Sequence, residues 1–228
     1  MVFDYSFWKF IVRPESLASQ LPEAEMRKFK SRMFFVFFLA VVLFTVRSFW
    51  GYGTESFTSL LVTDGEQFFA LARLLDLIAA GVWGIIYVAF HLFAVAFLFA
   101  AFTEVPARHF VPLQLLVVGL FLMEKALVFG LSAMQGAWAP VSFLSLGPIA
   151  MTYIDNDFLV YFFNQLTVTV VLVISIQYRF LKTMDPEQSK GKLLGALIGL
   201  HIAAALIVAG IQIVPFNELF DTIVGGGK

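Results

Sequence analysis

The chain has 228 residues, a formal net charge of −1 and no cysteine, and it is 60% hydrophobic and only 14% charged. Soluble domains are about half apolar and a quarter charged, so this balance is typical of a membrane protein. The absence of cysteine excludes disulfides, thiolate metal sites and thiol chemistry. The absence of a basic surface argues against nucleic acid as a partner.

The first element is a polar segment, residues 1–31, which is too short to form a hydrophobic core of its own. An aromatic cluster around Trp8 stands beside Lys9 and Arg13, a combination that suits the headgroup level of a bilayer. Pro14 should break the segment into shorter pieces. We expect an interfacial helix on the cytoplasmic leaflet, or else a solvated lead-in that only anchors the chain.

Five long apolar stretches follow, and each has about the 20 residues that a helix needs to cross a hydrocarbon core. Residues 32–214 are therefore predicted to form one all-α, polytopic membrane domain of five transmembrane helices. Residues 215–228 have apolar residues at helical spacing and should form a short amphipathic tail. In chain order, the predicted spans are Arg32 to Trp50, Leu74 to Phe102, Phe110 to Met134, Phe158 to Leu181 and Leu193 to Val214.

The distribution of Lys and Arg predicts the orientation. Eleven of the fifteen fall on one side of the predicted spans, whereas only Arg73 and Lys228 fall on the other. Because short loops rich in Lys and Arg stay in the cytoplasm, we expect a cytoplasmic N-terminus and an outer C-terminus. A cell (inner) membrane of prokaryotic type is the simplest location. The eleven are Lys9, Arg13, Arg27, Lys28, Lys30, Arg32, Arg108, Arg179, Lys182, Lys190 and Lys192.

Polar residues inside the bilayer are costly and usually face the interior of the bundle. Arg47 lies fifteen residues after Arg32, and Glu124 lies fifteen residues after His109, so both should be about 22 Å from the cytoplasmic side. Lys125, Asn164 and Gln165 fall at a similar level. We expect an Arg47–Glu124 ion pair assisted by Asn164. It would either lock the bundle or line a proton or ion path, unless Arg47 and Lys125 merely extend to the membrane surface.

Two histidines, His91 and His201, lie inside predicted spans. Two imidazoles on different helices can ligate a haem b, although a histidine can equally bond across a helix interface. No other cofactor and no metal site is expected. The chain has no His-Glu-x-x-His helix, no Gly-x-Ser-x-Gly elbow and no phosphate loop, so we do not expect an enzyme.

Glycine recurs every four residues at the start of the fifth span, at Gly191, Gly195 and Gly199. Such a stripe lets another helix approach closely. The pattern predicts tight packing but leaves open whether the second helix belongs to this chain.

The N-terminal element around Trp8, followed by Arg13-Pro14 and five spans after a cytoplasmic N-terminus, resembles the bacterial branch of the YIP-type (Ypt-interacting protein) membrane family. A glycine-rich stretch associated with the second and third spans of that family is absent here. The resemblance implies a non-enzymatic accessory protein that supports a transporter or membrane assembly.

Taken together, these features predict an accessory or scaffold subunit of a larger membrane complex, in contact with the lipid bilayer and with other membrane subunits. The first alternative is a small transporter or ion-conducting subunit that uses the layer of Arg47, Glu124 and Asn164. The second is an electron-transfer anchor that holds haem b between His91 and His201.

Overall fold

The structure is a computed structural model that describes residues 2–22, 25–52, 54, 65–103, 105–136 and 140–214. The chain divides into two compact units. The helices α10 (Val168–Met184) and α11 (Lys190–Gln212) each have residues in both units. Unit 1 comprises Met1–Trp138 and Ser175–Leu193, and unit 2 comprises Ala139–Ile174 and Leu194–Lys228.

Four helices of the described residues are long and apolar enough to cross a membrane. The shortest has 21 residues, which at about 1.5 Å per residue gives roughly the 30 Å of a hydrocarbon core. The chain is therefore an all-α protein of the multi-pass membrane class. The four helices are Phe29–Phe49, Glu66–Phe102, Ala107–Gln135 and Lys190–Gln212.

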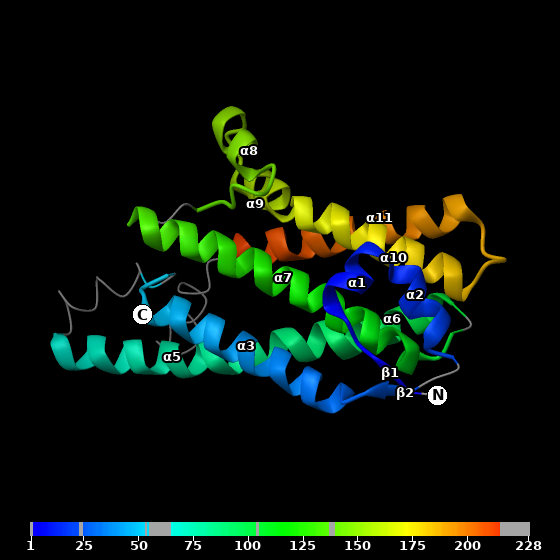
Figure 1. Cartoon of the computed structure of the whole chain (residues 1–228). Helices are drawn as coiled ribbons and strands as arrows, with labels where there is room; N and C mark the ends of the chain where they lie inside the picture. The colour runs from blue at the N-terminus through cyan, green and yellow to red at the C-terminus, as the bar shows by residue number, and fades with distance from the viewer. Residues whose placement is uncertain are drawn as a thin grey trace, which may run out of the picture. The chain divides into compact units, whose positions relative to one another are not determined.

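Unit 1 is built on three long helical segments. They are α3 (Phe29–Phe49), the continuous run α5 (Glu66–Ala89), η2 (Phe90–Ala94) and α6 (Val95–Phe102), and α7 (Ala107–Gln135). Figure 1 shows α3 and α5 side by side. They pack at van der Waals distance, because a Cβ on Gly84 would stand 3.1 Å from the backbone of Ala40.

The N-terminal segment of unit 1 forms several short elements: β1 (Val2–Asp4), α1 (Phe7–Val12), α2 (Pro14–Gln20) and β2 (Glu25–Arg27). The two strands pair in parallel. Pro14 divides the segment, as its sequence predicts, since proline fits the first position of α2. The segment thus forms two short helices and a two-stranded sheet, and its expected place at the membrane interface stays a prediction.

The side chains of this segment pack against the membrane helices. Phe10 and Leu17 are fully buried. Phe7 lies against Gly119, where an added Cβ would stand 2.6 Å from its ring. Gly119 is twelve residues into α7, about 18 Å from the start of that helix. The N-terminal segment therefore packs along α7 and not only against the first turn of that helix.

The core of unit 1 lies toward this same end of the helices. Phe110 stacks edge-on with Phe99 at 5.7 Å between ring centroids and lies 6.3 Å from Phe180. The first half of α7 continues the core, with every residue from Pro112 to Val118 buried. This end of the unit contains most of its tightly packed apolar side chains.

Unit 2 contains the principal departure from the expected spans. The stretch from Phe158 to Leu181 was predicted to be one continuous helix, but the structure interrupts it at residues 166–167. It divides into α9 (Asp157–Gln165) and α10, which has 17 residues. The freed backbone groups pair with the preceding loop, because Leu166 O accepts from Leu146 N at 3.2 Å and Val168 N donates to Leu144 O at 3.0 Å. A short helix, α8 (Gly147–Tyr153), packs against α9.

The predicted domain boundaries, at residues 31/32 and 214/215, stay predictions. The first long helix begins at Phe29, three residues before the expected start of the membrane domain. The predicted amphipathic tail, residues 215–228, lies outside the described residues.

Candidate functional site

Polar side chains from three helices of unit 1 meet around Tyr87 of α5. The ring of Tyr87 lies 5.5 Å from Phe44 of α3 and 4.3 Å from His91 of η2, and the Lys125 ammonium of α7 stands over it at 5.3 Å from the ring centroid. We call Arg47, Tyr87, His91, Glu124 and Lys125 the Tyr87 cluster.

Electrostatics connects the remaining members of this cluster. The charges of Arg47 and Glu124 both act on the Tyr87 hydroxyl and on the Lys125 ammonium. Arg47 and Glu124 therefore each lie within interaction range of both Tyr87 and Lys125. The structure thus brings together three residues that the sequence places at one level, and it adds Tyr87 at their centre. The expected Arg47–Glu124 ion pair stays a prediction.

Arg47 lies close to the C-terminal end of α3, but its side chain does not extend away from the bundle. Its guanidinium stands 4.2 Å from the ring of Tyr52 and 5.7 Å from the ring of Phe44, one turn back along α3. This direction follows from helix geometry, since side chains tilt toward the N-terminus of their helix. The backbone N–H of Tyr52 donates to Arg47 O at 3.0 Å. This hydrogen bond turns the chain back after α3, so that the ring of Tyr52 lies beside the guanidinium.

His91 occupies a local distortion of its helix. Residues Phe90–Ala94 form a π-helical turn between α5 and α6, and such turns are often found at functional sites. His91 Nδ1 lies 2.9 Å from Tyr87 O, and its ring contacts Phe121 of α7 edge-on at 5.6 Å. The imidazole therefore satisfies a backbone carbonyl of α5 just before the distorted turn while it packs between aromatic rings.

A second set of polar contacts joins α3 and α5 next to the cluster. Arg73 Nη2 donates to Ser48 O at 3.0 Å and to Phe49 O at 2.9 Å, and Ser48 Oγ donates to Asp76 Oδ2 at 2.5 Å. The last carbonyls of a helix have no partner within the helix, so Arg73 caps α3. The first residue of α5, Glu66, therefore stands about 10 Å beyond the end of α3.

Asn164 and Gln165 belong to unit 2, at the helix break. Asn164 Oδ1 accepts from Ser142 N at 2.7 Å and from Ser145 Oγ at 2.9 Å. Gln165 Nε2 donates to Tyr161 O, one turn earlier in its own helix, at 3.3 Å. Asn164 thus ties the preceding loop to α9. The structure gives it this local role, and its predicted part in the Arg47 layer stays a prediction.

His201 lies on the buried face of α11, between Leu197 and Ala205, and belongs to unit 2, whereas His91 belongs to unit 1. Haem ligation by this pair therefore stays a prediction. Within the described parts of the chain, no group of three His, Asp or Glu residues is placed to hold a metal ion.

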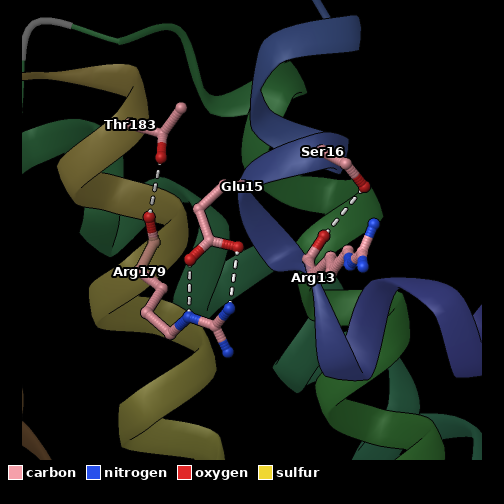
Figure 2. A network of polar contacts seen from close by, with 5 residues as sticks. All are labelled: Arg13, Glu15, Ser16, Arg179 and Thr183. Carbon is pink, nitrogen blue, oxygen red and sulfur yellow. Dashed lines mark hydrogen bonds and ion pairs between the residues drawn. The ribbon is translucent and has the colours of Figure 1, made fainter.

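A bidentate ion pair fixes the N-terminal segment to α10. Arg179 Nε and Nη2 donate to the two carboxylate oxygens of Glu15 at 2.6 and 3.0 Å, as Figure 2 shows. Partial burial alone would raise the pKa of Glu15, but the hydrogen bonds and charge of Arg179 outweigh it and hold that pKa below the ordinary value. About two fifths of each side chain is exposed, so the pair contributes modestly to stability.

A further basic contact holds the same segment at α3. Arg32 Nη1 donates to Tyr5 O, and the guanidinium of Arg32 stands 5.5 Å from the centroid of the Tyr5 ring. Burial raises the pKa of the Tyr5 phenol despite the opposing charge of Arg32. The phenol therefore stays neutral at physiological pH.

Sequence reasoning missed Tyr87 and Tyr52, because tyrosine is common in membrane helices near the interface. One signal was present: Tyr87 is one turn from His91 and fifteen residues from Phe102, where its helix ends. No family model, curated protein or solved structure matches the chain.

Proposed function

We propose that the protein is a non-enzymatic accessory or scaffold subunit of a larger membrane complex. The observation that supports this most is the open stripe of glycines on α11. Apart from the neighbouring residues and backbone of α11 itself, no heavy atom of the described residues lies within 4 Å of the point where a Cβ of Gly191, Gly195 or Gly199 would stand. A second helix, which the glycine stripe leads us to expect, therefore has room to pack against this side of α11.

The stripe lies opposite the buried face of α11. That face comprises Leu193, Leu197, Ala205 and Ala209, which recur at multiples of four residues and are at most 4% exposed. Successive residues of a helix are about 100° apart, so positions two residues away point to the other side. All three glycines are exposed. The side of α11 that faces away from the protein interior is thus the side on which backbones can approach closely.

The occupant that fits this face is a transmembrane helix of another subunit. In a bilayer, helix association depends on van der Waals packing, and small residues permit the closest contact. The resemblance to the YIP-type family implies the same accessory role. A second copy of this chain is the other occupant that the test distinguishes.

The proposal includes the predicted topology. The interrupted segment α9–α10 would provide the fifth crossing, since non-helical backbone is tolerated at membrane depth where protein buries it. The N-terminus would then be cytoplasmic and the C-terminus outside, in the cell (inner) membrane.

The test is native purification of the tagged protein with identification of its co-purifying chains, for the wild type and for Gly195→Leu/Gly199→Leu. We expect the double variant to lose at least nine tenths of its partner. Leucine has the higher helix propensity by nearly 1 kcal/mol per residue, so α11 itself should not be weakened. Gly130→Leu is the matched control, because the space around Gly130 of α7 is equally open.

Retention of the partner by the double variant would refute the stripe as the docking face. Purification of the wild type as a lone monomer from native membranes would overturn the scaffold proposal as a whole. Co-purification of a differently tagged copy would identify the occupant as a second copy of this chain.

The Tyr87 cluster favours a second candidate, a small transporter or ion-conducting subunit. Two cations, a carboxylate, an imidazole and a phenol from three helices are close together within the membrane region, and charged groups at such depth are frequent in proton and ion paths. Proton-coupled flux by the purified protein in liposomes, abolished in Glu124→Gln, would establish this function in place of the scaffold.

A further inference from the structure

The Tyr87 cluster has an unequal number of positive and negative groups. Arg47 and Lys125 are cationic, whereas Glu124 is the one carboxylate among the cluster's five members. The neighbouring Arg73 and Asp76 contribute one charge of each sign and do not alter the balance. Even with Glu124 paired to one cation, the other keeps its charge. An uncompensated charge in a membrane region is costly, and an anionic ligand removes that cost.

The two cations are also placed to receive a ligand. Both are held over aromatic rings, Arg47 over Tyr52 at 4.2 Å and Lys125 over Tyr87 at 5.3 Å. Arg47 and Lys125 are both residues of intermediate exposure. Among the described residues, the buried Nε of Arg47 has no hydrogen-bond acceptor. This N–H belongs to the planar fork with which arginine binds two oxygens of one anion.

The depth of the cluster suggests which anion it meets. α3 has 21 residues and so matches the hydrocarbon thickness, which places its C-terminal end near one boundary of the core. Arg47 precedes the last residue of α3 by two positions, so its Cα lies about 3 Å below that boundary. Trp50 and Tyr52 follow it, and such aromatic residues are enriched at headgroup level. Phosphate groups of lipids are concentrated at this level.

From these observations we propose that Arg47 and Lys125 bind a phosphate group in the leaflet that contains the C-terminal end of α3, which is the outer leaflet in the predicted orientation. Arg47 supplies the bidentate fork and Lys125 a point charge. The phosphate comes from a phospholipid headgroup or from free phosphate, and the experiment separates the two sources. The proposal does not depend on the scaffold function.

Native mass spectrometry of the delipidated, purified protein measures this binding, with three separate probes: phosphatidylglycerol, phosphatidylcholine and inorganic phosphate. The variants are Lys125→Gln, Lys125→Arg and a control, Lys190→Gln, at the start of α11. For a probe that occupies the site, we expect at least tenfold weaker binding to Lys125→Gln. Lys125→Arg and Lys190→Gln should stay within about twofold of the wild type.

The pattern of probes identifies the source. Binding of either lipid with this dependence on Lys125 assigns the phosphate to a headgroup, and preference for phosphatidylglycerol shows that net charge contributes. Binding of inorganic phosphate alone with the same dependence assigns a soluble ligand. If Lys125→Gln does not fold, Arg47→Lys replaces it, because it keeps the charge, removes the fork and should weaken binding at least fivefold.

Two results would overturn the proposal. One is the absence of saturable binding of all three probes to the wild type. The other is equal binding by the wild type and by whichever of Lys125→Gln and Arg47→Lys folds, because general association of lipid with apolar helices does not distinguish these side chains.

Discussion

At Gly84 the backbones of α3 and α5 approach closely, and Gly84→Ala tests that contact. A Cβ at this position would stand 3.1 Å from the carbonyl carbon and oxygen of Ala40 and from the backbone nitrogen of Val41. Carbon atoms pack comfortably at about 3.5–4.0 Å, so the new methyl group is roughly half an ångström too close. Backbone atoms cannot rotate away, and the two helices must therefore separate.

The size of the effect follows from two opposing contributions. Overpacking of a tight contact costs about 1–3 kcal/mol. Replacement of glycine by alanine within a helix stabilises it by about 0.8–1.0 kcal/mol. Gly130→Ala is the matched control, because it has the second contribution without the first: its Cβ would meet nothing within 4 Å. Gly84→Ala should therefore be about 1–3 kcal/mol less stable than Gly130→Ala.

The measurement is the free energy of unfolding in mixed detergent micelles, titrated with a denaturing detergent and followed by circular dichroism. Gly81→Ala provides an intermediate case, since its nearest neighbour at 3.4 Å is the Thr45 hydroxyl, which can move aside. Its stability should lie close to that of Gly130→Ala. Equal stability of Gly84→Ala and Gly130→Ala would refute the close packing of α3 on α5.

Two further predictions concern the polar contacts. Arg179→Gln should cost about 1 kcal/mol or less and should raise hydrogen exchange in α1 and α2, whereas Arg13→Gln should not, because the Arg13 side chain points away from Glu15 (Figure 2). The pKa of Glu15 is lowered in the folded state, so its contribution is present at neutral pH and is lost as the pH falls through that lowered pKa. Equal protection factors for α1 and α2 at pH 7 and pH 3, after correction for the intrinsic pH dependence of exchange, would contradict this. Asn164→Leu leaves Ser142 N without its acceptor, whereas Ser145 Oγ can still donate to Ser142 O, and should cost about 1–3 kcal/mol in the same detergent titration, with Gln165→Leu nearly neutral. Equal stability of the two variants would show that the break does not depend on Asn164.

Hydropathy alone predicts where most of the long helices lie, because length and apolarity determine whether a segment can cross the bilayer. It could not predict the break at residues 166–167, since Leu166 and Thr167 are neither glycine nor proline and lie within an apolar run. The backbone groups that pair with the break come from Leu144 and Leu146 in a preceding loop. Pairing of this kind depends on tertiary structure, which a local pattern does not contain.

Part of the candidate site could also be predicted, for a related reason. Counting residues along an unbroken helix gives a level in the membrane, and this reasoning placed Arg47 and Glu124 together. The same count for Asn164 assumes a continuous fourth span. Because the helix ends at Gln165, the count carries no information on the level of Asn164.

Both irregular turns have a polar side chain that satisfies backbone groups nearby, as the membrane requires of any departure from the α-helix. His91 contacts Tyr87 O beside the π-turn, and Asn164 accepts from Ser142 N beside the break. A polar residue within an apolar stretch can therefore indicate that the backbone is irregular there, and it does not by itself indicate a path for a solute. The side chains of Arg47 and Lys125 instead lie over aromatic rings. These two cations are for that reason the groups at which a bound anion should be sought.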